Sequence, residues 1–362
     1  MDISQFEQTQ AASDLVQYGW GGATAARFIS VLQSGLMPGR IVRVDRGRLQ
    51  VATHNGITPC VAGRHLGEAP LAVGDWVTVR PEPGYDLIVE DVVERTSAIM
   101  RRDPSPGDNR DQILAANVDK VFVLCGLDGD AHLGGLERYL VMIWDSGAIP
   151  VVVLTKADLV DPADVAATLA AVAGNAPGVE VHVISCVTEA GVAALAGSIA
   201  AGATIALVGE SGSGKSTLVN TLAGEEILLT GATRDSDGKG RHTTTARQLV
   251  PLPGGAVLID TPGLRAVGLA EGSIGVAQVF ADVIELMDGC KFRNCSHRTE
   301  PGCAIVEAIA AGDLERRRFD SYLRLEKEQA RVASRQEALV SRAERKQVAR
   351  NRLKSARQSR EP

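Results

Sequence analysis

The stretch that decides the fold is TIALVGESGSGKSTLVNTL, residues Thr204 to Leu222. Its apolar start, Ile205–Val208, predicts a buried strand, and the segment after it favours a helix. Between them lies the pattern G-x-x-x-x-G-K-[ST], in the strand–loop–helix context that this pattern requires. Its glycines let the backbone wrap around phosphate oxygens, Lys215 reaches the outer phosphates, and Ser216 can bind Mg²⁺. The sequence therefore predicts a nucleotide phosphate loop formed by Gly209, Glu210, Ser211, Gly212, Ser213, Gly214, Lys215, Ser216 and Thr217.

The length of the chain and its apolar content predict two or three packed domains, since 45% of its 362 residues are hydrophobic. No apolar run approaches the ~18 residues that span a bilayer, and Met1–Gln10 is polar and acidic, unlike a secretory signal. Three of the six cysteines are scattered and three are clustered, which argues against a disulfide framework. We therefore expect a cytoplasmic, monomeric protein that does not bind membranes.

Charge is distributed unevenly along the chain. The net charge is −6, but the residues from Asp313 onward include 15 Lys and Arg and 8 Asp and Glu. This basic end suggests a polyanionic partner that contacts one region of an otherwise acidic protein.

The N-terminal third predicts an arm followed by a barrel. Residues 1–37 are weakly patterned and are expected to form an arm with a short helix. Residues 38–96 form short alternating runs separated by turn residues, which predicts a small β-barrel of the oligonucleotide-binding (OB) type. A purely structural barrel is the alternative, because arginines offer phosphate contacts but aromatic residues for base stacking are nearly absent. The expected strands are Arg40–Val44, Arg48–Ala52, Thr58–Ala62, Asp75–Val79 and Tyr85–Val89.

An α/β domain is expected next. Residues 97–112, rich in Arg, Asp, Pro and Gly, predict a linker, and residues 113–270 then alternate strands and helices. Three strands precede the phosphate loop, whereas in an ordinary P-loop domain this loop follows the first strand. The elements expected before the loop are strands Lys120–Cys125, Pro150–Leu154 and Val179–Ile184, and helices Leu133–Trp144 and Asp161–Val172.

The loops after these strands explain the unusual order. Thr155-Lys156-Ala157-Asp158 resembles the N/T-K-x-D guanine element of GTPases, in which Asp158 accepts from guanine N1 and N2 and Lys156 packs beneath the base. Ser185-Cys186 resembles the element whose backbone contacts guanine O6. Asp260-Thr261-Pro262-Gly263 resembles the Mg²⁺-sensing switch, in which Asp260 and Gly263 approach the nucleotide. Guanine elements, phosphate loop and switch thus follow one another in a circular permutation of the usual GTPase, which is permissible because domain termini often lie close together.

A cluster of metal-ligating residues follows the switch, within residues 271–318. Cys290, Cys295, His297 and Cys303 offer three thiolates and one imidazole, a set that suits a tetrahedral structural Zn²⁺ with no position open for catalysis. Free buried cysteines are the alternative. The flanking segments, Asp282–Asp288 and Ala304–Ala311, are expected to be helices that the metal joins.

Together these motifs resemble the small ribosomal subunit biogenesis GTPase A family (RsgA, also called YjeQ). The resemblance covers about residues 36 to 325 and rests on the permuted order, the phosphate loop, the Gly240–Thr245 sequence G-R-H-T-T-T, the D-T-P-G switch and the C-x₄-C-x-H-x₅-C finger. The family implies an OB-fold barrel, a permuted GTPase domain and a zinc domain. It also implies GTP hydrolysis that the small (30S) ribosomal subunit and its rRNA stimulate during late maturation. Thr155 departs from the more common Asn and places more of the guanine selectivity on Asp158.

The candidate catalytic residue is His242. Leu264 occupies the position where many GTPases have a water-orienting Gln, and a leucine cannot position water, whereas an imidazole can. A solvent-exposed loop histidine is the alternative. Thr243 or Thr244 is expected to close on Mg²⁺ and the γ-phosphate, and the sequence does not choose between them. We expect slow intrinsic turnover until a partner orders this loop.

Two functions compete with a subunit-stimulated GTPase. One is a GTP-regulated RNA-binding switch with a non-ribosomal target, and the other is a metabolic P-loop kinase, which would use neither Asp158 nor the permuted order. Residues 319–362 predict a basic tail that is either a mostly solvated helix or disordered. In the functional interpretation, its Lys/Arg cluster after Arg342 contacts rRNA phosphates.

Overall fold

The computed structural model describes residues 11–29, 35–45, 48–66, 70–82, 87–101, 112–128, 133–227, 247–260, 274–331 and 334. The chain divides into two compact units, Met1–Gly268 and Leu269–Pro362. Every helix within the described ranges is too short or too polar to cross a bilayer.

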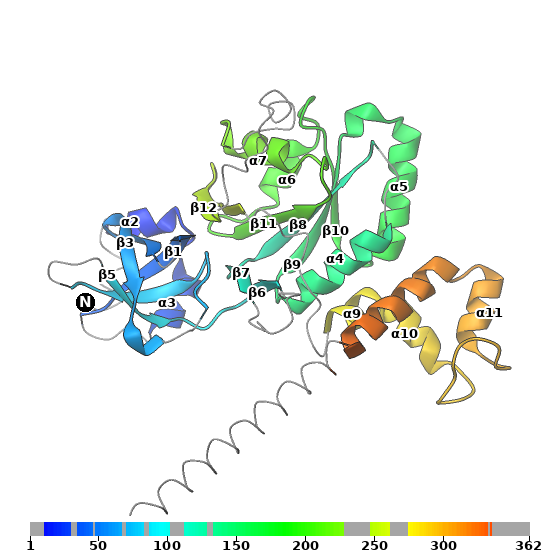
Figure 1. Cartoon of the computed structure of the whole chain (residues 1–362). Coiled ribbons are helices and arrows are strands. Elements are labelled where there is room, and N and C mark those ends of the chain that lie inside the picture. Colours follow the sequence, from blue (N-terminus) through cyan, green and yellow to red (C-terminus); the bar gives the residue numbers. More distant parts are fainter. Residues whose placement is uncertain are drawn as a thin grey trace, which may run out of the picture. The chain divides into compact units, whose positions relative to one another are not determined.

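Five strands of the first unit close into a barrel (Figure 1). Their order is β1-β2-β3-β5-β4, and β4 pairs again with β1, which closes the sheet. The β3–β5 pair is parallel and the other pairs are antiparallel. Its core consists of Ile41, Leu49, Val51, Cys60, Val77, Val79 and Val89. The predicted OB-type barrel is thus confirmed, with strands β1 (Met37–Asp45), β2 (Arg48–Thr53), β3 (Gly56–Ala62), β4 (Trp76–Arg80) and β5 (Leu87–Val92).

The N-terminal arm contains two helices, α2 (Ala11–Val16) and α3 (Gly22–Phe28), where one was expected. An aromatic cluster holds this arm against the barrel. The ring of Trp20 lies 5.2 Å from that of Phe28 and 5.6 Å from that of Trp76 on β4, in tilted and edge-on arrangements that aromatic pairs prefer.

A mostly parallel sheet forms the rest of the first unit. Its order is β10-β9-β8-β11-β13-β12, and only the β12–β13 pair is antiparallel. Figure 1 shows α6 and α7 on one side of this sheet and α4 and α5 on the other. The strands are β8 (Lys120–Gly126), β9 (Ile149–Thr155), β10 (Glu180–Val183), β11 (Thr204–Gly209), β12 (Gln248–Pro251) and β13 (Val257–Asp260). The helices are α4 (Leu133–Asp145), α5 (Pro162–Asn175), α6 (Val192–Gly197) and α7 (Lys215–Ala223).

Both faces of the central strands β8, β9 and β11 are buried, so these strands are continuous apolar runs rather than alternating ones. Phe122 and Leu124 of β8 pack in one core cluster with Leu195 of α6 and Leu218 of α7. Val121 and Val123, which alternate with them along β8, are also buried and face the opposite side, where α4 lies. Strand β13, which comes last in the sequence, lies next to β11. Strand β11 lies in the interior of this sheet, although β8, β9 and β10 precede it in the chain.

The expected linker over residues 97–112 is partly wrong. Ala98–Arg101 forms strand β6, which pairs antiparallel with β7 (Gln112–Ala116) in a separate two-stranded sheet. A strand of four residues is too short for its hydrophobic pattern to be recognised in the sequence. Its partner strand β7 lies beyond the Pro- and Gly-rich segment that suggested a linker. Ser97 further ties this ribbon to the domain, because its hydroxyl donates to the carbonyl of Val118 at 2.7 Å.

One fully buried cation joins the arm, the barrel and the parallel sheet. Arg40 of β1 donates to the hydroxyl of Thr204, the first residue of β11, at 2.8 Å, and its guanidinium lies 4.7 Å from the centre of the Trp76 ring. Burial lowers the pKa of Arg40 to about 10, although the charges of Asp119 and Asp75 oppose this shift, so the side chain remains charged at neutral pH. Its remaining acceptors are the carbonyls of Tyr18, Gly74 and Asn117.

The second unit is helical, with α9 (Ile274–Val279), α10 (Ala281–Asp288), α11 (Ala304–Ala311) and a helix over residues 316–331. Arg318, only 4% exposed, forms a bidentate pair with Asp282 of α10, with both N···O distances at 2.7 Å. Its guanidinium also lies 5.0 Å from the centre of the Phe280 ring. This pair, of which the Arg318 side is buried and the Asp282 side is partly exposed, fixes the last helix against α10.

The boundary expected at residue 319 is wrong, because the first part of the predicted tail belongs to the core of the second unit. Phe319, Tyr322 and Leu325 are at most 6% exposed, and the Phe319 and Tyr322 rings stack at 6.3 Å. The basic composition of this segment predicts a solvated tail, but two aromatic residues three positions apart lie on one helix face and pack together. The Lys/Arg cluster after Arg342 lies outside the described residues.

We predict that Arg40→Met lowers the free energy of unfolding of the first unit by about 3 kcal/mol, because four buried acceptors lose their donor. Arg43→Met on the same strand is the matched control. Arg43 is half-exposed and pairs only with Asp45 among the described ion pairs, so its loss should cost less than about 0.5 kcal/mol. Urea unfolding followed by tryptophan fluorescence measures both variants, and equal losses would contradict the assigned role of Arg40.

Candidate nucleotide site and candidate metal centre

Five parallel strands end at one edge of the sheet, and the residues that follow four of them form the described part of the candidate nucleotide site. The register aligns Gly126 of β8 with Thr155 of β9, and Leu124 of β8 with Gly209 of β11. The loops after β8, β9, β10 and β11 are therefore neighbours at the carboxyl edge, where open α/β sheets bind ligands. The structure thus brings together the predicted guanine elements and the predicted phosphate loop.

The phosphate loop is a tight turn between β11 and α7. Gly209 begins it with φ of 147°, and a Cβ there would lie 2.5 Å from the Leu124 carbonyl oxygen, so only glycine fits. Gly212 and Gly214 also have positive φ, and α7 begins at Lys215, with Ser216 and Thr217 in its first turn. The N-terminal N–H groups of this helix and the turn before it suit a polyphosphate.

The ammonium group of Lys215 lies inside this turn. It donates to the carbonyls of Gly209 at 2.9 Å and Glu210 at 2.5 Å, and it lies 3.2 Å from the Ser213 hydroxyl. Ser211 and Gly212 at the tip of the loop are exposed, whereas Ser213 is 5% exposed. The cation is thus held at the concave side of the loop, where it can neutralise phosphate charge.

Thr155 joins the guanine element to the phosphate loop. Its side chain, 2% exposed, donates to the Ser213 carbonyl at 2.9 Å and lies 3.4 Å from the Cys125 carbonyl. The hydroxyl therefore acts within the protein, across the two loops, and is not available to a base. This position departs from the usual Asn, and here the threonine hydroxyl connects the two loops.

Asp158 and Ser185 form the second contact between loops. The Ser185 hydroxyl donates to Asp158 Oδ1 at 2.6 Å and accepts from the backbone N–H groups of Val187 at 3.2 Å and Thr188 at 3.1 Å. Asp158 is exposed, so the carboxylate is oriented by Ser185 and still open to a ligand. A fixed, solvent-facing carboxylate suits the two adjacent donors of guanine.

Lys156 pairs with a residue that sequence reasoning missed. Its ammonium lies 2.5 Å from Oδ2 of Asp128, in the loop after β8, and this cation holds the pKa of Asp128 below its usual range. The signal available in the sequence was position alone, since Asp128 follows a predicted strand at the same sheet edge.

Cys125 and Cys186, which lie near the parallel sheet, have structural roles. Burial raises the pKa of Cys125 to about 11, with the charge of Glu210 adding to the shift, and burial also raises the pKa of Cys186. Cys186 packs against the core cluster beneath α6 and α7. Both thiols are therefore protonated at neutral pH and make poor nucleophiles.

Several predicted site residues lie outside the described residues. These are His242, Thr243, Thr244 and Gly263. Asp260 is placed by its backbone as the last residue of β13, aligned with Gln248 of β12.

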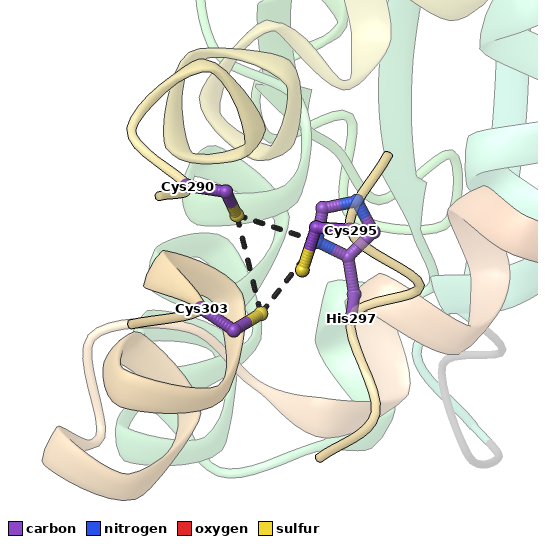
Figure 2. A group of neighbouring side chains, drawn as sticks. All are labelled: Cys290, Cys295, His297 and Cys303. Carbon is purple, nitrogen blue, oxygen red and sulfur yellow. Dashed lines mark hydrogen bonds between the residues drawn. The ribbon is translucent and has the colours of Figure 1, made fainter. Parts of the chain in front are cut away.

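The predicted zinc ligands converge in the second unit (Figure 2). The ligand atoms of Cys290, Cys295, His297 and Cys303 all lie within 4.8 Å of one another. His297 Nδ1 is 3.5 Å from Cys290 Sγ and 3.6 Å from Cys303 Sγ, and these two sulfurs are 4.0 Å apart. Bond lengths of about 2.3 Å for Zn–S and 2.0 Å for Zn–N place tetrahedral ligand atoms about 3.5–3.8 Å apart. The set therefore fits one tetrahedral Zn²⁺.

The ligands sit at the ends of the helices that they join. Cys290 follows the last turn of α10, and Cys303 precedes the first turn of α11 as its N-cap residue. Between them the Lys291 N–H donates to the Gly302 carbonyl at 3.0 Å, and His297 adopts a left-handed backbone with φ of 57°. The His297 ring packs edge-on against Phe319 at 5.8 Å, which orients the imidazole and connects the centre to the last helix.

Known proteins resemble this chain over most of its length. Residues 92–270 match the sequence model of the RsgA GTPase family. A small ribosomal subunit biogenesis GTPase RsgA from Streptomyces coelicolor is 46% identical over 330 residues, which cover 90% of this chain and 89% of the relative. A protein of the same name from Streptomyces avermitilis is 45% identical over 336 residues and covers 91% of this chain and 90% of the relative.

Two solved structures have a similar fold. YjeQ from Thermotoga maritima superposes with a TM-score of 0.59 at 23% identity and covers 82% of this chain and 99% of its own. YloQ, described as a circularly permuted GTPase, superposes with a TM-score of 0.57 at 22% identity and covers 82% of this chain and 96% of its own. The permuted GTPase fold expected from the order of the motifs is thus confirmed.

We predict that replacing both Cys290 and Cys295 with Ser abolishes zinc binding and speeds hydrogen exchange in α10 and α11, because the two helices lose the ligands that join them. Lys291→Ser is the control, since Lys291 is exposed and is not a ligand. Elemental analysis of the purified proteins should give about one zinc per chain for wild type and for this control. A wild-type protein that purifies without metal and still protects both helices would contradict the assignment.

Proposed function

The chain belongs to the RsgA GTPase family, and on this premise we propose which of its residues bind GTP and which partner it acts on. It is a GTPase of ribosome biogenesis. We infer that GTP binds at the carboxyl edge of the parallel sheet, with its phosphates in the Gly209–Thr217 loop and its base between Lys156 and Asp158. The observation that carries this proposal is the Thr155–Ser213 bond, because it locks the guanine element and the phosphate loop into one site.

The ligand atoms that the chain offers indicate which metal ions it binds. The family uses a nucleotide with Mg²⁺, and Ser216, in the first turn of α7, is the proposed Mg²⁺ ligand, as in other P-loop proteins. Asp260 and Gly263 are the proposed switch residues. One structural Zn²⁺ is assigned to Cys290, Cys295, His297 and Cys303, and it supplies folding free energy rather than catalysis.

The hydrolytic step is assigned to His242, with Thr243 or Thr244 closing on the γ-phosphate. Support comes from position 264, where the chain has a leucine in place of the water-orienting Gln of many GTPases, so another side chain must orient the water. Turnover then depends on a partner that helps to complete this catalytic arrangement.

The proposed partner is the small ribosomal subunit, the particle in the names of the relatives. The barrel has the OB topology, whose β2–β3 face binds oligonucleotides in other proteins, and here Arg48 and Gln50 are exposed on β2. A GTP-regulated RNA-binding switch with a non-ribosomal target is the alternative. Purified small subunits should raise the rate of GTP hydrolysis, whereas an equal mass of free RNA should not; equal stimulation by both would favour the alternative.

We predict that Asp158→Asn weakens GDP binding about a hundredfold, because one of the two carboxylate oxygens is replaced by an NH₂ group, which cannot accept from a guanine donor. The same variant should gain affinity for xanthosine diphosphate, whose C2 carbonyl accepts from the new amide. Lys215→Ala should instead weaken both nucleotides, since it acts on the phosphates. Titration calorimetry separates these patterns, and unchanged GDP affinity in Asp158→Asn would rule out the guanine assignment.

We predict that His242→Ala lowers the subunit-stimulated kcat about a hundredfold and leaves GTP affinity close to that of wild type, because the imidazole acts mainly in the transition state. His182→Ala is the control, since His182 lies on edge strand β10 and contacts Glu180. Single-turnover hydrolysis with saturating small subunits gives the comparison. Equal rates in the three proteins would show that His242 has no part in hydrolysis.

A further inference from the structure

Asp128 occupies a place in the nucleotide site that the family motifs do not assign. It follows β8, whereas its partner Lys156 follows β9, and the two strands are parallel neighbours. The Leu127 N–H donates to the Thr155 carbonyl at 3.0 Å, so the two loops are joined by a backbone hydrogen bond directly beside the ion pair. This hydrogen bond holds the backbone of Asp128 close to the backbone of Lys156.

The backbone beneath Asp128 leaves room for its carboxylate. A Cβ on Gly126 would lie 2.7 Å from Asp128 Oδ1 and 3.8 Å from the Ser213 Cα in the phosphate loop. Any side chain at position 126 would therefore displace the carboxylate. With this space open, one oxygen of Asp128 lies over the Gly126 backbone and the other contacts the Lys156 ammonium.

Lys156 needs such an anchor because its backbone conformation is restricted and its side chain is not. Its φ of 61° and ψ of 37° are left-handed, which is uncommon for a residue with a Cβ. This backbone conformation fixes the direction of the Cα–Cβ bond. The four-carbon stem itself loses rotamer entropy when it is ordered. A counterion at its tip restricts the stem before a base arrives.

An ordinary surface ion pair is the competing explanation. The side chains are 30% and 42% exposed, and pairs of this exposure contribute little to folding stability. The two explanations differ in whether the ion pair contributes to folding stability or to ligand binding. A surface pair would have a small effect on unfolding and none on ligand binding, whereas an anchor for Lys156 affects binding through the lysine alone.

We propose that Asp128 is a positioning residue that holds the Lys156 stem in the orientation in which it packs against the guanine base. This inference rests on the proposed function, which assigns the base to the space beside Lys156. Because the base does not change during hydrolysis, Asp128 contributes equally to GTP and GDP binding. It therefore lowers KM and leaves kcat unchanged.

A double-mutant cycle on GDP affinity tests the proposal. Asp128→Asn should raise the Kd for GDP about three- to fivefold, the range of a partly exposed ion pair. Lys156→Met should raise it further, and the double variant should bind like Lys156→Met alone, because Asp128 acts only through this lysine. Asp91→Asn, which makes the same charge change on the exposed side of barrel strand β5, should leave the Kd unchanged.

The other outcomes overturn the proposal in distinct ways. An Asp128→Asn variant with wild-type Kd refutes it, and an effect that persists in the Lys156→Met background shows a Lys156-independent change of the loop or of the local field. A lower urea midpoint or a lower kcat in Asp128→Asn would also contradict a role in positioning alone. Wild-type protein that fails to bind GDP would refute the proposed function instead, so the two failures are distinguishable.

Discussion

The first unit depends on burying one cation at the junction of its parts. Arg40 is fully buried, yet its donors reach three carbonyls and one hydroxyl from segments that are far apart in sequence, including Thr204, 164 residues away. An unpaired charge in such a place is too costly to persist, so the arm, the barrel and the start of β11 must all be in position together. Gly19 shows the same constraint, because a Cβ there would lie 2.8 Å from Arg40 Nη1.

The nucleotide site depends on strand register in a similar way. The aligned ends of β8, β9 and β11 place Asp128, Lys156 and the phosphate loop at one edge, and side-chain-to-backbone bonds such as Thr155 to Ser213 then join the loops. Parallel pairing uses only spatial neighbours, so chain order has no influence on the finished site. This is the physical reason that the permuted sequence builds the same constellation of loops as an unpermuted one.

Sequence reasoning succeeded where the chemistry is local and failed where it is long-range. The phosphate loop and the zinc ligands are short patterns whose residue types leave few alternatives, and both were predicted residue by residue. Strand β6, the Asp128–Lys156 pair and the buried Arg40 depend on partners that no periodicity reveals. The sequence pattern places Phe319 in the tail, because a single aromatic residue is recognised as a core residue only when its contacts are known. Here the contact is with His297 of the metal centre.

The pairing of β1 with β12 also affects how the protein behaves toward other chains. Through Arg43 and Gln248 the barrel continues the nucleotide sheet into eleven strands, and the barrel end closes on itself through β1 and β4. Among the strands of this sheet that the structure describes, β10 is thus the one with an unpaired side. It has only four residues, with Glu180 and His182 along it, and a short charged border is a poor template for intermolecular β-pairing. Docking the barrel onto the sheet therefore also protects the protein against aggregation.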